Sequence, residues 1–321
     1  VYYDGLQGAG NYVFPKLLDK KGVNYTHVKS TGQEGPNPIK ENLIELRNAV
    51  ANDKDSDGLI VGLANDGDAD RFGVIDEKGN FISTNDVLLL TAYHLTKNKG
   101  LDGTIIRSQS TSDLLDKIAE KYDLEVSETP VGFKYLGKDI LEARKNGGDI
   151  LIAGEESGGL TTHGHIPEKD GILALSLIME LIATENKPLS KILTDIKDEI
   201  GEYSQTETIS VRYPNDEQKE AVMKQAEKMY NDVVDNGNTD FNGTHTVDRE
   251  RTYNIRERMK TYKEGGDGFK FIMTDDSNIL VRKSGTEPVV RFRVEAKGAT
   301  QEEANYNYDV IRQDLSDIFK I

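Results

Sequence analysis

The chain has 321 residues, 40 Lys or Arg against 56 Asp or Glu, a formal net charge of −16 at pH 7 and no cysteine. This acidity argues against a nucleic acid partner, and the lack of cysteine excludes disulfides, thiolate metal sites and cysteine nucleophiles. Because no apolar run is long enough to span a bilayer and no signal segment opens the chain, we expect no membrane contact and a cytoplasmic location.

The length predicts two or three domains, and the first, residues 1–99, has an α/β pattern. It opens with a strand, a glycine-rich turn, a helix and a second strand, which is a βαβ unit. Val1 is not Met and already lies in the first strand, so we expect the chain to begin within a longer protein. The expected strands are 1–4, 24–28, 58–64 and 72–75, and the expected helices are 12–20, 41–52 and 85–96.

Two further domains follow, at residues 100–205 and 206–321. The second repeats the α/β pattern and ends in a linker near residue 205. The third has strands packed on two helices, which is an α+β arrangement. The expected fold is thus two three-layer α/β/α domains with mixed sheets and a smaller α+β C-terminal domain. The expected strands are 104–107, 124–127, 149–153, 206–212, 268–273, 277–282 and 289–296, and the expected helices are 112–121, 138–145, 171–183, 189–198, 215–235 and 304–318.

The segment NDGDADRFG at 65–73 places three carboxylates, Asp66, Asp68 and Asp70, at alternate positions after an apolar run, and Arg71 follows. Such close carboxylates repel one another unless a cation lies among them, and Mg²⁺ prefers oxygen ligands. The sequence therefore predicts a magnesium site on a connection between two strands.

Three other interpretations of this segment remain to be weighed. A solvated acidic turn would need no ligand. A calcium helix-loop-helix requires Gly at the sixth position of the loop, where Arg71 stands, and helices on both sides. A phosphatase with an aspartate nucleophile would require Thr in place of Asp70. We rate the magnesium site above all three.

A second loop, GEESGG at 154–159, presents Glu155 and Ser157 between glycines. A carboxylate accepts hydroxyl protons and a serine both donates and accepts, so the pair suits the hydroxyl groups of a hexose. Alone, the segment could equally be an acidic turn. His163 and His165 follow closely, but without a third ligand at metal spacing we interpret them as loop residues.

A third loop, RKSGTEP at 282–288, joins two strands and supplies two cations, two hydroxyls and a Gly that permits close approach of the backbone. These are the parts of a phosphate cradle, although an ordinary basic hairpin has the same composition. Arg291 and Arg293 follow at alternate strand positions, so both point to one face of that strand.

The three loops in this order resemble the α-D-phosphohexomutase family, which includes phosphoglucomutases and phosphomannomutases, over the whole chain. The resemblance implies that the first loop binds Mg²⁺, the second the sugar hydroxyls and the third the substrate phosphate. The metal ligands would be Asp66, Asp68 and Asp70, with Arg71 as an active-site cation. The substrate-binding residues would be Glu155, Ser157, Arg282, Ser284, Gly285, Thr286 and Arg291.

The same resemblance implies two weaker assignments near the substrate. Gly132 and Lys134 in TPVGFKY match a third-domain loop, and Lys169 with Asp170 in IPEKDGI match the segment after the sugar loop. As alternatives, Lys134 could be a surface lysine and Asp170 could cap the following helix.

The family's phosphorylated serine lies in a Ser-His-Asn loop of its first domain, and no Ser-His pair occurs in this chain. The resemblance implies domains two to four of a mutase that interconverts hexose 1-phosphate and hexose 6-phosphate through a phosphoserine and glucose 1,6-bisphosphate. The chain alone should bind hexose phosphates and transfer nothing until its N-terminal domain is present. The EES form of the second loop resembles that of phosphoglucomutase-type members, which implies glucose rather than mannose or an amino sugar. Alternatives are a non-catalytic phosphosugar-binding protein and a metal-dependent phosphatase.

Overall fold

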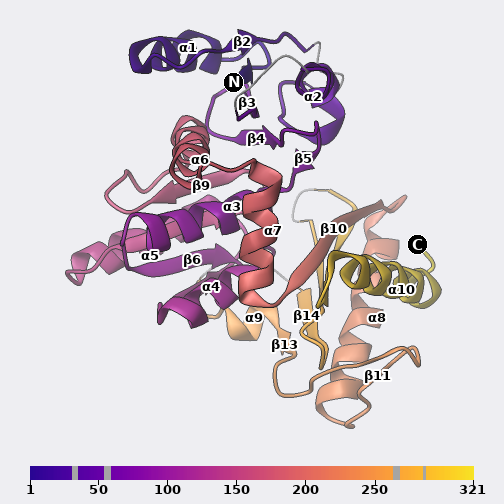
Figure 1. Ribbon diagram of the computed structural model, residues 1–321. Helices are drawn as coiled ribbons and strands as arrows, with labels where there is room; N and C mark the ends of the chain where they lie inside the picture. Colours follow the sequence, from indigo (N-terminus) through magenta and orange to yellow (C-terminus); the bar gives the residue numbers. More distant parts are fainter. Residues whose placement is uncertain (31–34, 54–58, 263–267, 285–286) are drawn as a thin grey trace. The chain divides into compact units, whose positions relative to one another are not determined.

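The computed structural model describes residues 1–30, 35–53, 59–262, 268–284 and 287–321 (Figure 1). These residues form two units, 1–200 and 201–321. Within the described ranges, no helix combines the length and the apolar character needed to cross a membrane.

The N-terminal unit begins with a five-stranded mixed sheet of order β2-β1-β3-β4-β5. The strands β2, β1 and β3 run parallel, whereas β4 and β5 pair antiparallel. The apolar residues of α2 cover one face and those of α1 cover the other, which gives three layers. The elements are β1 (Tyr2–Asp4), α1 (Gly10–Lys21), β2 (Thr26–His27), η1 (Lys40–Leu43), α2 (Ile44–Ala51), β3 (Gly62–Asn65), β4 (Phe72–Ile75) and β5 (Phe81–Ile82).

The second sheet of this unit has four strands in the order β7-β6-β8-β9, and only β9 is antiparallel to its neighbour. Helix α5 covers one face through Phe133, Leu136 and Ile140. The elements are α3 (Thr84–Tyr93), η2 (His94–Asn98), β6 (Thr104–Ser108), α4 (Leu114–Tyr122), β7 (Val126–Thr129), α5 (Phe133–Lys145), β8 (Ile150–Glu155), β9 (Gly159–Thr162), α6 (Gly171–Glu185) and α7 (Leu189–Ile200).

One hydrophobic core joins the two sheets of the N-terminal unit. It contains Tyr3 and Leu63 from the first sheet, Ile152 from the second, and the buried apolar residues of α3 and α6. The packing is so close that a Cβ added at Gly154 would lie 2.3 Å from a methyl carbon of Leu88 in α3. The two sheets therefore hold their loops in a common frame.

The C-terminal unit is an antiparallel sheet of order β10-β16-β15-β14-β13. Helices α8 and α10 pack on its apolar face, which carries Val281, Phe292 and Val294 (Figure 1). Asn215 begins α8 as predicted, because its side chain accepts a hydrogen bond from the Gln218 N–H. The elements are β10 (Tyr203–Arg212), α8 (Asp216–Val234), β11 (Asp240–Phe241), β12 (His245–Thr246), β13 (Tyr253–Asn254), α9 (Ile255–Arg258), β14 (Gly268–Ile272), β15 (Asn278–Lys283), β16 (Val289–Gly298) and α10 (Gln301–Phe319).

The expected fold class is confirmed, and the differences concern single elements. The expected linker near residue 205 is wrong, because Gln205 lies inside β10 and pairs with Ala296 of β16. No strand was expected between residues 154 and 170, but β9 lies there and pairs with β8. Helix α5 begins at Phe133 rather than near 138, because Phe133, Leu136 and Ile140 already form its buried stripe.

Candidate functional site

The carboxylate loop, residues 66–71, joins the antiparallel strands β3 and β4. Asp66 closes the loop: its Oδ1 accepts hydrogen bonds of 3.0 Å from the backbone N–H groups of both Asp70 and Arg71. The buried Asn65 holds the other side, because its amide donates to the Arg71 carbonyl at 2.8 Å and its Oδ1 accepts from the Tyr3 hydroxyl at 3.1 Å. Side-chain bonds to the backbone therefore give this short connection a defined shape.

The donor chemistry of the carboxylate loop fits a hard cation. Burial raises the pKa of Asp66, and the adjacent Asp70 carboxylate raises it further, against the backbone N–H groups that lower it. A cation between the two carboxylates would relieve this repulsion. Asp68, however, is exposed, and no three acidic or histidine side chains among the described residues lie close enough together to hold a metal. The loop thus has two carboxylates adjacent, with the third apart.

The loop GEESGG at 154–159, which is expected to bind sugar hydroxyls, is called the sugar loop below. It begins in the last residues of β8 and carries Glu155 at the end of that strand. Glu155 is buried, and its Oε1 accepts a hydrogen bond of 2.6 Å from the backbone N–H of Gly132. Burial raises the pKa of Glu155 to about 7, and the charge of Glu156 adds to this rise. Lys169 and Arg71 oppose it through their positive charges. Ser157, at the turn, is exposed. The loop therefore offers one oriented carboxyl group and one accessible hydroxyl.

The structure brings the carboxylate loop and the sugar loop together within the N-terminal unit. Lys169 Nζ lies 2.8 Å from Asp70 Oδ2, and a Cβ added at Gly158 would lie 3.5 Å from the Arg71 Cβ. At the start of α6, the Gly171 N–H donates to the Ala69 carbonyl at 3.2 Å. Side chains from residues 70, 71, 155 and 169 therefore share one electrostatic environment.

Three further residues were expected near this site, and the structure gives each a different environment. Gly132 precedes α5 with φ +130° and holds Glu155, whereas Lys134 is exposed in the first turn of α5. Asp170 caps α6 by accepting a hydrogen bond from the Leu173 N–H at 2.9 Å, as its alternative interpretation predicted. Its Oδ2 also lies 3.0 Å from His165 Nε2.

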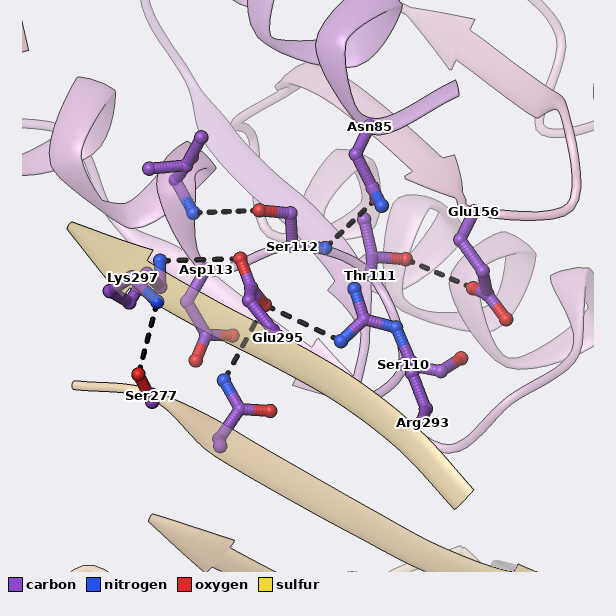
Figure 2. A network of polar contacts seen from close by, with 12 residues as sticks. Asn85, Ser110, Thr111, Ser112, Asp113, Glu156, Ser277, Arg293, Glu295 and Lys297 are labelled. Atoms are coloured by element: carbon purple, nitrogen blue, oxygen red, sulfur yellow. Dashed lines mark hydrogen bonds and ion pairs between the residues drawn. The ribbon is translucent and has the colours of Figure 1, made fainter. Parts of the chain in front are cut away.

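Sequence reasoning missed the residues that hold the sugar loop from behind. Glu156 Oε2 accepts hydrogen bonds from the hydroxyls of Ser108 at 3.2 Å and Thr111 at 3.4 Å, and Figure 2 shows the contact with Thr111. Ser108 ends β6 and Thr111 follows that strand; both are buried, and their hydroxyl oxygens lie 2.9 Å apart. The hydroxyl-rich segment SQSTS at 108–112 is the signal in the sequence that could have found them.

The third loop, RKSGTEP at 282–288, is expected to bind phosphate and is called the phosphate loop below. It belongs to the C-terminal unit. Arg282 on β15 is the direct cross-strand partner of Arg291 on β16, so both side chains lie on one face of the sheet. Ser284 is buried, and its N–H donates to the Val289 carbonyl at 2.8 Å. Gly285 and Thr286, expected in the same clamp, lie outside the described residues.

Arg291 differs from Arg293 and Lys297, the other cations on this face of β16, in its ion pairing. Glu295 Oε2 lies 3.4 Å from Arg293 and its Oε1 lies 3.2 Å from Lys297, so these two cations share one carboxylate (Figure 2). Arg291, on the same face, forms no ion pair with any residue that the structure describes. Two like charges directly opposite each other destabilise a sheet, and an anion between them would remove that cost.

Three models of one family match the sequence in succession. They are described as phosphoglucomutase/phosphomannomutase α/β/α domain II at residues 1–79, α/β/α domain III at 83–199 and the C-terminal domain at 211–313. All three loops lie within these matches.

Relatives and solved structures agree with the domain matches. A phosphoglucomutase/phosphomannomutase of Thermococcus kodakarensis is 31% identical over 305 residues, which cover 92% of this chain and 57% of the relative. The open form of parafusin, a phosphoglucomutase of Paramecium, has a TM-score of 0.74 at 25% identity. The match covers 99% of this chain and 57% of the parafusin chain.

A third similar structure contains ligands. The N-acetylphosphoglucosamine mutase of Aspergillus fumigatus, solved with GlcNAc-6P and magnesium, has a TM-score of 0.55 at 14% identity, and the match covers 99% of this chain and 61% of that one. At this identity the likeness concerns the fold alone. In each comparison the chain spans about three fifths of the length of the similar protein. The chain belongs to the phosphoglucomutase/phosphomannomutase family, the α-D-phosphohexomutases, and contains its domains II, III and IV.

Proposed function

We propose that this chain forms the metal-, sugar- and phosphate-binding parts of a phosphohexomutase. The enzyme would interconvert hexose 1-phosphate and hexose 6-phosphate, with glucose favoured, through a phosphoserine and glucose 1,6-bisphosphate. The main support for the proposal is that two loops meet in one unit. Lys169 contacts Asp70, and the positive charge of Lys169 lowers the pKa of Glu155. A solvated acidic turn and an unrelated glycine loop would have no reason to be linked in this way.

The proposed roles follow the chemistry of each side chain. Asp66, Asp68 and Asp70 would hold Mg²⁺, which would neutralise charge at the transferring phosphoryl group. Glu155 and Ser157 would bind sugar hydroxyls, because the Gly132 N–H orients one oxygen of Glu155 and leaves the other able to accept. Arg71 and Lys169 would supply positive charge beside the phosphoryl group, with Lys134 in the first turn of the adjacent α5.

The phosphate is assigned to the C-terminal unit. Arg282 and Arg291 present two guanidinium groups on one face, which suits bidentate binding of phosphoryl oxygens. Ser284, Gly285 and Thr286 complete the proposed clamp. In terms of domains, we assign the metal loop to residues 1–99, the sugar loop to 100–205 and the clamp to 206–321.

The nucleophile is not among the residues of this chain that we assign. No Ser-His pair of the family's phosphoserine loop occurs in residues 1–321, and the three matched models are domains II, III and IV. We therefore propose that the chain binds hexose phosphates, while phosphoryl transfer depends on the serine of the family's N-terminal domain. We also propose that the enzyme acts in the cytoplasm.

The test combines calorimetric binding with an activity assay. Glucose 1-phosphate and glucose 6-phosphate should both bind in the presence of Mg²⁺, and Arg282→Ala should weaken the binding of both. Conversion of one into the other, with glucose 1,6-bisphosphate added, should be absent. Release of inorganic phosphate would instead identify a phosphatase, and turnover to the isomer would place a nucleophile in this chain. Absence of hexose phosphate binding would refute the proposal altogether.

A further inference from the structure

A cavity of about 290 Å³ lies where β1 and β2 end, outside all three loops assigned above. The two strands are parallel, so their carboxyl ends meet at one edge of the sheet, which is where α/β sheets commonly bind ligands. The lining has seven residues, six of them with polar or charged side chains. It consists of Asp4, Gln7, Asn11, His27, Val28, Lys29 and Ser30.

Ser30 has an unsatisfied group in this lining. The residue is only 2% exposed, and its backbone N–H is used, since it donates to Asp4 Oδ2 at 2.8 Å. Its hydroxyl Oγ is buried and has no hydrogen-bond partner among the residues that the structure describes. Buried hydroxyls in folded proteins are nearly always paired, so an unpaired one in a cavity wall indicates a ligand or ordered water.

The acceptors around the cavity are already occupied. Asp4 Oδ1 accepts from the Leu6 N–H at 2.8 Å and Oδ2 from Ser30. Asn11 Oδ1 lies 2.8 Å from His27 Nε2, so in the tautomer that donates this bond the Asn11 amide hydrogens remain available. The Asp4 carboxylate therefore ties the two strand ends together and offers little to a cation.

The donors, in contrast, are available. Lys29 forms no ion pair with any part of the chain that the structure describes. Gln7 lies in the loop after β1, where φ is +42° at Leu6 and +64° at Gln7, a conformation that non-glycine residues rarely adopt. An ammonium, a hydroxyl and two amides converge on one cavity, and such a set recognises an acceptor-rich, negatively charged group.

We propose that this cavity binds a small oxyanion, either inorganic phosphate or a carboxylate group, through Lys29, Ser30, Asn11 and Gln7. This site is separate from the Arg282 and Arg291 pair, and it does not depend on the proposed mutase function. The occupied carboxylate of Asp4 argues against a divalent cation.

The ring of His27 is a local reporter, since it lines the cavity and the chain has only 5 histidines. Histidine NMR spectra, with the His27 signal assigned by comparison with His27→Gln, would be recorded during titration with inorganic phosphate and, separately, acetate. Sodium chloride at matched ionic strength serves as the baseline. We expect a saturable shift of the His27 signal with at least one of the two anions, and the stronger one identifies the ligand class.

Variants separate a built site from general charge effects. Lys29→Met should weaken the apparent affinity at least tenfold and Ser30→Ala at least threefold, whereas Arg282→Ala and the exposed Lys78→Met should leave it unchanged. Because Ser30→Ala removes an unpaired hydroxyl, its urea midpoint should not fall. A His27 shift no larger than with chloride, or equal affinities in all four variants, would overturn the proposal.

Discussion

Lys169 Nζ and Asp70 Oδ2 lie 2.8 Å apart, although their residues belong to loops that extend from different sheets. The Asp70 carboxylate raises the pKa of Lys169, so the lysine is charged at neutral pH. A fixed ammonium beside a carboxylate loop partly compensates the repulsion that a metal ion would otherwise relieve. Lys169 would therefore compete electrostatically with the proposed metal ion for the same carboxylate.

This competition predicts the effect of Lys169→Met on metal binding. Removing the ammonium should raise the affinity of the chain for Mg²⁺ about tenfold, or about 1.4 kcal/mol, because two cations close to one carboxylate repel each other. Calorimetric titration with Mg²⁺ measures this, with the exposed Lys78→Met as the matched control. An affinity that stays the same or falls would show that Lys169 does not oppose the metal.

The cross-strand pair Arg282 and Arg291 predicts a loss of binding without a loss of stability. Either Arg→Ala change should weaken glucose 6-phosphate binding by about 10- to 100-fold, the range for a hydrogen bond to a charged group. For Arg291→Ala, the free energy of unfolding should stay constant or rise by a few tenths of a kcal/mol, since like charges no longer face each other. Arg312→Ala, on the exposed side of α10, should change neither quantity. Equal binding in all three variants would rule out the clamp.

The raised pKa of Glu155 predicts a pH dependence of stability. Its pKa is about 7 in the folded chain against 4.5 in the unfolded one, so the folded state binds the proton more tightly. This contribution is fully present below pH 4.5 and is lost as the pH rises through about 7, with a total of up to about 3 kcal/mol. Urea unfolding between pH 5 and 8 should show the decline in the wild type, and Glu155→Gln should flatten it. The same slope in both proteins would contradict the assignment.

The hydroxyl contacts behind the sugar loop predict that Glu156 is a positioning residue. Glu156→Ala should weaken glucose 6-phosphate binding several-fold and leave inorganic phosphate binding unchanged, because the sugar loop moves and the clamp does not. Glu156→Gln retains an oxygen that accepts from Ser108 and Thr111, so it should recover most of the sugar affinity. If Gln binds as weakly as Ala, the negative charge of Glu156 matters rather than its position.

The contact between α6 and the carboxylate loop predicts a sensitive glycine. A Cβ added at Gly171 would lie 2.3 Å from the Arg71 carbonyl oxygen and 2.5 Å from Asn65 Nδ2. Gly171→Ala should therefore destabilise the chain by about 1–3 kcal/mol, the usual cost of overpacking. Gly148→Ala, whose Cβ would meet its nearest atom at 3.6 Å, should have little effect in the same urea titration. Similar midpoints for the two variants would refute this close contact.

Elements with a strong local signal could be predicted from the sequence alone. A short apolar run located β4, helical spacing located α10, and Asn215 identified the start of α8, since each depends on neighbouring residues. The three loops were visible for the same reason: each is a short segment of unusual composition. Local pattern was less informative for β9 and for the first turn of α5, which are stabilised by pairing with β8 and by packing against the second sheet.

Which loops are in contact, and which side chains form hydrogen bonds within the chain, could be seen only in the tertiary structure. Lys169 joins Asp70 because α3 and α6 share one core with both sheets, and residues so far apart in sequence carry no local sign of that contact. In the same way, the second Glu of EES points back to Ser108 and Thr111, while the first is buried against Gly132. Their roles differ because burial and hydrogen bonding depend on long-range packing, which composition and spacing do not encode.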